Sequence, residues 1–97
     1  MAGITSFQER VEFHERHLID LYGSHLLVGA SLRAVLGFRT GSAFRQAVRR
    51  ARLPVPTFIA PGRRGRMATV LDVARWMAAL EQKISPEESA YGVARDK

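Results

Sequence analysis

The 97-residue chain has no cysteine, and this absence excludes several kinds of site. Without thiols it forms no disulfide, offers no thiolate to a metal ion and carries no cysteine nucleophile. It also has no apolar run approaching the roughly eighteen residues that indicate a membrane-spanning helix. Acidic side chains stand near the N-terminus where a signal peptide would be apolar, so we expect an intracellular protein with no membrane partner.

Lysine and acidic residues are scarce beside arginine. Only two of the fifteen basic residues are lysines, and nine acidic residues leave a formal net charge of +6. The planar guanidinium of arginine matches phosphates and guanine edges, whereas lysine acts as a mobile point charge. This composition predicts a polyanionic partner, with nucleic acid as the leading candidate. A hydrophobic fraction of 46% is enough for one small folded domain.

The first predicted helix begins at Thr5 or Ser6, either of which is a suitable cap, and ends at Gly23. Apolar residues and one histidine recur along it in steps of three and four: Phe7, Val11, His14, Leu18 and Leu21. This stripe either packs on the rest of the domain or forms the interface of a homodimer. The short apolar run at residues 25–28 then predicts an edge strand or an extended lead-in.

Two further helices follow, separated by a tight turn at Gly37. The first has three apolar residues at helical spacing: Leu32, Val35 and Leu36. The second spans about 42–52, with Thr40 or Ser42 as its cap. Its predicted inward face consists of Phe44, Ala47, Val48 and Ala51. Pro54 must end it, because proline cannot continue the helical hydrogen bonds.

A β-hairpin is predicted over residues 57–68. Strand-forming residues at 57–59 and 66–68 flank the turn formers Pro61, Gly62 and Gly65. The last helix follows from Thr69, whose side chain is placed to cap it. Its predicted buried stripe consists of Val70, Val73, Ala74, Met77 and Leu80.

This order of elements predicts a mainly α fold with a small β-hairpin wing, that is, a winged helix-turn-helix with an added N-terminal helix. Residues 1–25 form the added helix, used for packing or oligomerisation. Residues 26–84 form the winged helix-turn-helix, a DNA-binding domain. Residues 85–97 begin with a Ser-Pro break and contain few core residues, so we expect a flexible tail.

The helix at 42–52 carries four arginines and no acidic residue, where a solvated helical face usually mixes charges. A recognition helix places its N-terminal residues against base edges in the major groove and its other residues on phosphates. The outward positions predicted to contact bases are Ser42, Arg45, Gln46 and Arg49. Those predicted to contact the backbone are Thr40, Arg50 and Arg52.

The hairpin tip repeats this charge pattern, because the stretch PGRRGR places three arginines around two glycines. Small residues let the chain approach a sugar–phosphate edge, and arginine is favoured by the negative potential of a narrow minor groove. We therefore expect Arg63, Arg64 and Arg66 to contact the DNA backbone or the minor groove.

Other groupings of reactive side chains match no catalytic or metal-binding pattern. The stretch HERH at residues 14–17 lacks the H-E-x-x-H spacing of a zinc helix. Asp20, Ser24 and His25 have no accompanying oxyanion-hole or nucleophile-elbow pattern. We expect a protein that is not an enzyme and that uses no metal ion or cofactor.

The stretch from Leu26 to Leu80 resembles small winged helix-turn-helix, MerR-like regulators of mobile elements. These include the AlpA-type phage regulators and the excisionases, also called recombination directionality factors. The matching pieces are an L-G-F turn, the basic helix, the basic wing and the stretch LDVARWM. The pieces FRQAVRRARLPVP and LDVARWM are also similar to the pyocin-activator type of transcription factor. The long leading helix departs from the AlpA pattern and leaves the oligomeric arrangement open.

The resemblance implies sequence-specific binding of double-stranded DNA in the bacterial cytoplasm, in association with the nucleoid. The leading hypothesis is a transcriptional regulator of a mobile or accessory element, which acts with RNA polymerase. One alternative is an excisionase that bends attachment-site DNA and directs an integrase, as a homodimer or a side-by-side oligomer. A second is a protein-interaction adaptor whose basic face meets an acidic protein.

Overall fold

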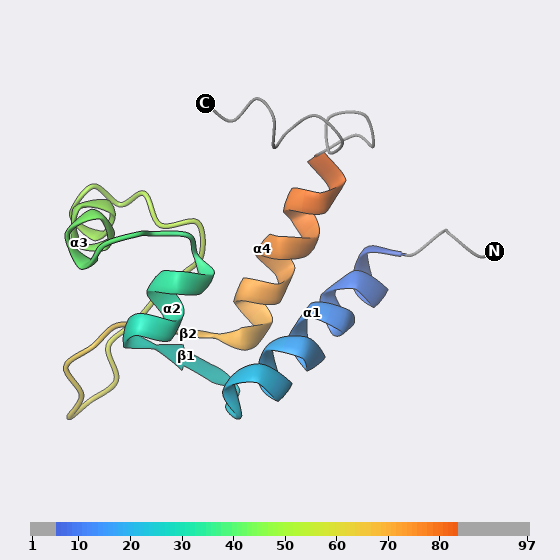
Figure 1. Ribbon diagram of the computed structural model, residues 1–97, viewed down its shortest axis with the longest axis horizontal. Coiled ribbons are helices and arrows are strands. Elements are labelled where there is room, and N and C mark those ends of the chain that lie inside the picture. The colour runs from blue at the N-terminus through green and yellow to red at the C-terminus, as the bar shows by residue number, and fades with distance from the viewer. Residues whose placement is uncertain (1–5, 84–97) are drawn as a thin grey trace.

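The computed structural model describes residues 6–83, which form four α-helices and one small antiparallel sheet (Figure 1). The elements in chain order are α1 (Phe7–Tyr22), β1 (Leu26–Val28), α2 (Gly29–Val35), α3 (Gly41–Arg49), β2 (Met67–Thr69) and α4 (Val70–Lys83). The prediction of a mainly helical chain with a small β component is confirmed. The tail predicted for residues 85–97 lies outside the described residues.

α1 begins and ends at its predicted capping residues. The Ser6 hydroxyl accepts a hydrogen bond from the Glu9 N–H at 3.1 Å, and the Glu9 carboxylate accepts one from the Ser6 N–H at 3.1 Å. This reciprocal pair satisfies N–H groups that have no partner within the helix. Gly23 ends the helix with a φ of 68°, in the left-handed region that glycine enters most easily.

α1 and α4 lie side by side in antiparallel directions (Figure 1). Val11 of α1 is buried against Ala74 and Ala78 of α4, whose small side chains let the two helices approach each other closely. The cap of α4 is as predicted, since the Thr69 hydroxyl accepts a hydrogen bond from the Asp72 N–H at 3.0 Å.

Glu81 of α4 binds two residues of α1. Its carboxylate accepts hydrogen bonds of 2.8 and 2.9 Å from the Arg10 guanidinium and lies 2.8 Å from the His14 Nε2 atom. The hydrogen bond from Arg10, assisted by His14, lowers the pKa of Glu81 to about 2. The same contact raises the pKa of Arg10 above its ordinary value. This cluster holds the first turns of α1 against the end of α4.

The apolar stripe predicted along α1 is only partly buried. Three of its members are buried within the chain: Val11, His14 and Leu18. A dimer interface built from these three is therefore contradicted, because α4 and the core already cover them. Phe7 is 39% exposed and Leu21 is 62% exposed. Near the end of α1 the buried side turns toward Ile19, which packs against the core, so Leu21 faces solvent.

β1 and β2 join two distant parts of the chain. Leu27 lies opposite Ala68 in the antiparallel register, and both residues are buried. The Val70 N–H donates to the His25 carbonyl at 2.8 Å, so α4 starts directly where β2 ends. The short apolar run before α2 is therefore a strand, one of the two possibilities that its composition left open.

The hairpin predicted over residues 57–68 is wrong as a two-stranded unit. Phe58 and Met67 exchange backbone hydrogen bonds of 2.9 and 2.8 Å, but this is a single bridge. β2 pairs mainly with β1 instead. Pro56 has no N–H for the next bonded position, and Pro61 starts a turn soon after the bridge, so the first strand cannot lengthen.

The central core includes residues from five of the six elements and from the segment after α3. Its buried members are Leu18, Leu27, Leu32, Leu36, Val55, Ala68, Val70 and Val73. α1 contributes Leu18, so it shares one core with the segment at 26–83. On α4 the predicted stripe is shorter than expected, because Met77 is only half-buried and Leu80 is 40% exposed.

The turn after α2 lies at Gly37, as predicted, and Gly37 has a φ of 91°. The Gly37 N–H donates to the Ala34 carbonyl at 3.0 Å, and the Phe38 N–H donates to the Arg33 carbonyl at 3.1 Å. These two bonds form a Schellman motif, which satisfies the last carbonyls of the helix. The chain then turns sharply into α3.

α3 ends in the same motif but without glycine. Ala51 has a φ of 54°, its N–H donates to Val48 at 3.1 Å, and the Arg52 N–H donates to Ala47 at 2.8 Å. The helix therefore stops at Arg49, and the predicted extent of 42–52 is wrong at its C-terminal end. Ala51 is exposed, in contrast to its predicted inward position.

Candidate nucleic-acid interface

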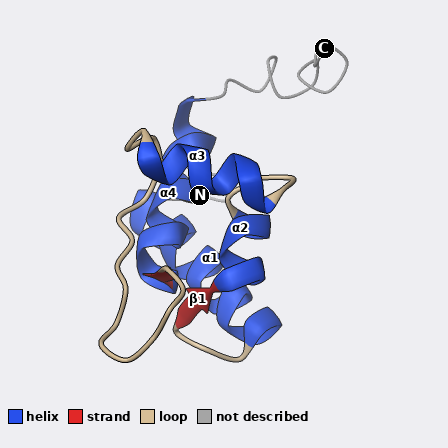
Figure 2. Ribbon diagram, turned by 90° about the vertical axis from the view of Figure 1, so that its left-hand side faces the viewer, coloured by secondary structure: helices blue, strands red, loops and turns tan. Residues whose placement is uncertain are grey.

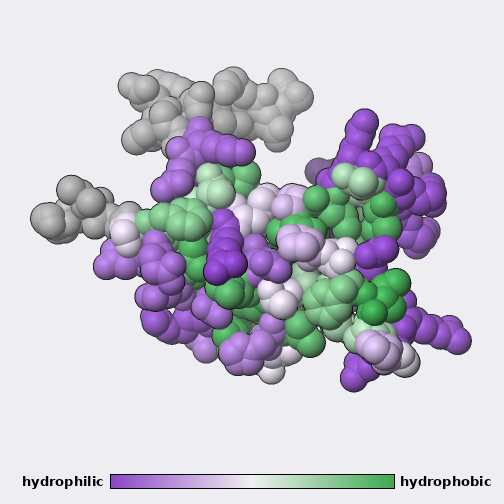
Figure 3. Space-filling model, turned by 180° about the vertical axis from the view of Figure 1, so that it is seen from behind, coloured by the Kyte–Doolittle hydropathy of each residue, from purple (hydrophilic) through white to green (hydrophobic). Residues whose placement is uncertain are grey.

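Acidic and basic residues are unevenly distributed along the sequence. No acidic residue lies between Asp20 and Asp72. The arginines in this interval are Arg33, Arg39, Arg45, Arg49, Arg50, Arg52, Arg63, Arg64 and Arg66. Figure 3 shows strongly hydrophilic side chains over α3 and over the tip of the loop that leads to β2, with hydrophobic residues between the two groups. α3 and this loop therefore carry a concentrated positive charge.

α3 is held with one face inward by contacts on both sides of its first turn. The Thr40 hydroxyl accepts a hydrogen bond from the Ala43 N–H at 3.0 Å and caps the helix. The Phe38 and Phe44 rings meet edge to face with their centroids 5.6 Å apart, and Ala47 is buried. The four side chains predicted to contact bases are all exposed: Ser42, Arg45, Gln46 and Arg49.

Arg33 fixes the turn that aims α3. Its Nη1 atom donates to the Phe38 carbonyl at 3.4 Å and to the Arg39 carbonyl at 3.1 Å. The sequence did not predict this role, because nothing in it indicates that an arginine of a short helix donates hydrogen bonds to carbonyls five and six residues later. The bonds satisfy carbonyls in the turn and tie the end of α2 to the start of α3.

We define the basic loop as residues 59–66, between the Phe58 bridge and β2. Seen from the α3 side, this loop and α3 lie in front of the α1–α4 pair (Figure 2). Arg66 is half-buried at the end of the loop and donates to the Thr57 hydroxyl at 3.0 Å. This bond ties the two ends of the loop together, so Arg66 supports the loop in addition to carrying charge.

A cavity of about 320 Å³ lies between α3 and the basic loop. We call it the helix–loop cavity, and it is lined by Phe44, Arg45, Val48, Arg49, Ile59, Arg64 and Arg66. Two arginines come from α3 and two from the loop, so the fold brings together charges that lie far apart in the sequence. Its apolar members form the rest of the lining.

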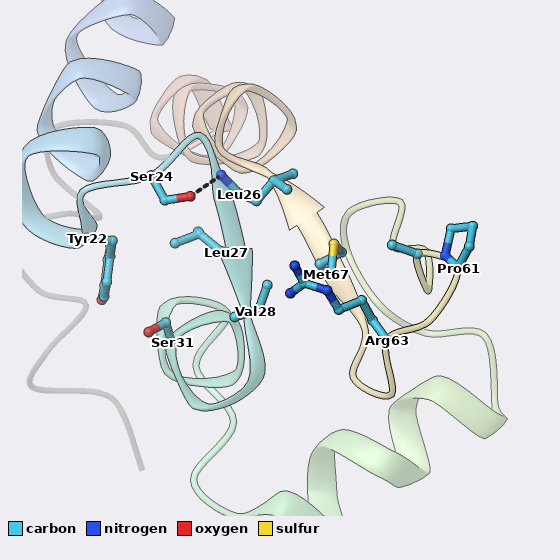
Figure 4. A pocket seen from close by; sticks show the side chains of 10 residues that line it. Tyr22, Ser24, Leu26, Leu27, Val28, Ser31, Pro61, Arg63 and Met67 are labelled. Atoms are coloured by element: carbon cyan, nitrogen blue, oxygen red, sulfur yellow. Dashed lines mark hydrogen bonds between the residues drawn. The ribbon is translucent and has the colours of Figure 1, made fainter.

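Arg63 belongs to a different surface from its neighbour Arg64. It lines a cavity of about 560 Å³ together with Val28, Pro61 and Met67, and Figure 4 shows its guanidinium directed toward Met67 and Val28. The loop thus divides its arginines between two sides. The three predicted wing arginines do not act as one cluster.

Arg50 and Arg52 are exposed just beyond the end of α3. The Arg50 N–H and the Arg52 N–H both donate to carbonyls of the last helical turn, which fixes their backbone. Neither residue lines the helix–loop cavity. They extend the positive surface along the chain that leaves α3.

No helix among residues 6–83 is long and apolar enough to cross a membrane. Within the same range, no group of three or more histidine, cysteine or acidic side chains is placed to hold a metal ion. The histidines of the HERH stretch are separated in role, since His14 is buried on Glu81 and His17 stacks on Phe13.

Comparison of the chain with protein-family models, with curated proteins and with solved structures found no match.

Proposed function

We propose that the protein binds double-stranded DNA in a sequence-specific manner and regulates transcription from a mobile or accessory genetic element, without catalysis. The observation that carries this proposal is the convergence of α3 and the basic loop. Each contributes arginines to one exposed surface, on a segment without a single acidic residue. Such a surface suits the closely spaced phosphates of a duplex.

In this proposal α2 and α3 form the helix-turn-helix, and the basic loop is the wing. Support comes from the order of the elements, because β1 precedes α2 and the loop returns the chain to β2. The Phe58 bridge to Met67 of β2 also supports the proposal, because Phe58 lies where the third strand of a winged sheet would pair. α3 enters the major groove, and the wing lies on the adjacent backbone or minor groove.

A selection of bound sites from random duplexes tests sequence specificity. We expect enrichment of a defined site, and we expect Gln46→Ala to lose discrimination at one base pair by about 1–3 kcal/mol. Gln46 is exposed on α3 and does not line the helix–loop cavity. Enrichment of no sequence at all by the unmodified protein contradicts the proposal.

The selected sites also separate regulation from recombination. A site within a promoter supports transcriptional control, whereas a site within an attachment sequence supports the excisionase alternative. A competition experiment tests the adaptor alternative. That alternative is supported if an acidic polypeptide of equal charge displaces the duplex and the protein prefers no DNA site.

A further inference from the structure

We propose that the helix–loop cavity holds one sugar–phosphate unit of a DNA strand, with Arg45 and Arg49 on the backbone and not on base edges. This inference rests on the proposed function and goes beyond it, because it assigns a ligand subsite. Base recognition then falls to Ser42 and Gln46, which are exposed on α3 outside the cavity lining.

The cavity walls supply positive charge from two elements. Arg45 and Arg49 lie one turn apart on α3, and Arg64 faces them from the basic loop; all three are exposed. Within residues 6–83 none of the three forms an ion pair with a carboxylate. Like charges held around one cavity repel one another, and an anion between them relieves this repulsion.

Arg66 adds a fourth guanidinium that is already fixed. It is half-buried, and its hydrogen bond to Thr57 holds it in place at the end of the loop. A donor held before the ligand arrives loses less side-chain entropy when it binds than a mobile donor does. The cavity therefore combines one hydrogen-bonded guanidinium with three exposed ones.

Part of the cavity lining is apolar, and this distinguishes a sugar–phosphate unit from a simple anion. Phe44 and Val48 are half-buried, while Ile59 is 51% exposed beside the arginines. A deoxyribose ring presents C–H groups next to its charged phosphate. A lining that combines apolar and cationic side chains matches both parts of that unit, whereas a free phosphate uses the cationic side chains alone.

The opposite side of the loop does not have this composition. Its larger cavity contains one arginine, Arg63, among serine, tyrosine and apolar residues (Figure 4). A DNA strand bound in the helix–loop cavity passes between α3 and the wing. α3 and the wing then lie in the two grooves on either side of that strand. The geometry thus assigns one segment of the DNA backbone to the junction between α3 and the basic loop.

The test is a double-variant cycle on duplex binding by fluorescence anisotropy. Arg49→Gln and Arg64→Gln are each expected to weaken binding about tenfold, to a selected duplex and to a scrambled duplex alike. Each variant makes the negative slope of log affinity against log salt shallower by about 1. Because both side chains contact one phosphate, the double variant loses less than the product of the single losses. Arg16→Gln, on the exposed side of α1, is the matched control and changes neither quantity.

Two results would overturn the inference while leaving DNA binding intact. One is a change of preferred base in Arg49→Gln with an unchanged salt slope. The other is a double variant whose losses multiply. Circular dichroism of each variant establishes that the fold is retained.

A second measurement uses the smallest probe that has both parts of the unit, the dinucleotide thymidylyl-thymidine. In NMR spectra we expect saturable shifts of the Nε–H groups of Arg45, Arg49 and Arg64 and of the Ile59 methyls. Inorganic phosphate shifts the arginine signals without the Ile59 methyls. Equal shifts at Arg16, or none in the cavity, overturn the inference even if duplex binds. Cavity shifts without any duplex binding support the subsite and contradict the proposed function.

Discussion

Position decides what each arginine does in this protein. Arg10 binds a carboxylate on the neighbouring helix, and Arg33 binds two backbone carbonyls of a turn. Arg45, Arg49 and Arg64 are exposed and meet across a cavity. The sequence shows all five as the same residue type, so it identifies a basic segment but does not separate arginines that bond within the fold from arginines exposed at the proposed interface.

Arg33→Ala is expected to destabilise the fold by about 1 kcal/mol, because the carbonyls of the α2–α3 turn lose their donor. Urea unfolding of the variant measures this loss. Duplex affinity below the unfolding transition is expected to change much less than in Arg49→Gln. An Arg33→Ala variant of normal stability that no longer binds DNA would contradict the assignment of Arg33 to the turn.

Glu81→Gln is expected to lower stability at neutral pH by about 1 kcal/mol, a value reduced for the 41% exposure of the side chain. The pKa of Glu81 falls from its ordinary value of 4.5 to about 2 on folding, so the ionised form stabilises the native state. That stabilisation is complete above pH 4.5 and is lost as the pH falls toward 2.

The measurement is the free energy of unfolding of both proteins between pH 2 and pH 7. The difference between them is expected to shrink as the pH falls through this window. Glu15→Gln, which removes a carboxylate that forms no ion pair with residues 6–83, is the control. A difference that is constant with pH would contradict the role of the Glu81 charge.

At the scale of elements, local signals predicted the helices better than the strands. Ser6, Gly23, Gly37 and Thr69 all mark helix ends as expected, because capping depends on a few neighbouring residues. The main partner of β2 is β1, about forty residues away, and no local pattern indicates that pairing. The predicted hairpin therefore captured the return of the chain but not the sheet that it joins.

The end of α3 was missed for a related reason. The Schellman motif there uses Ala51 at a φ of 54°, where the usual signal is glycine. The basic helix and the basic loop could be chosen as the candidate site from sequence alone, since charge and spacing are visible there. The division of its arginines between two sides of the loop depends on the three-dimensional path of residues 59–66.

Ala51→Gly is expected to stabilise the protein by about 1 kcal/mol, because glycine relieves the left-handed strain of alanine. Gly37→Ala is the reciprocal change and is expected to destabilise by a similar amount, although the added Cβ meets no atom within 4 Å. Thermal unfolding of both variants measures these two changes in stability. A stability loss in Ala51→Gly would contradict the described end of α3.

At the scale of the whole molecule, the two ends differ in charge. The α1–α4 pair contains the carboxylate of Glu81 and the acidic residues of α1, and it covers one side of the core. α3 and the basic loop form the other end, with arginines and no acidic residue. In the proposed function, this separation orients the molecule so that its basic end approaches the DNA first.

The affinity of the unmodified protein for a duplex across a series of salt concentrations tests the central claim most directly. If the basic end neutralises about five phosphates, log affinity falls linearly with log salt, with a slope of about −4.5. Fluorescence anisotropy with a labelled duplex gives this slope in one experiment. Negligible binding at low salt, or binding that does not weaken as salt rises, would contradict the account.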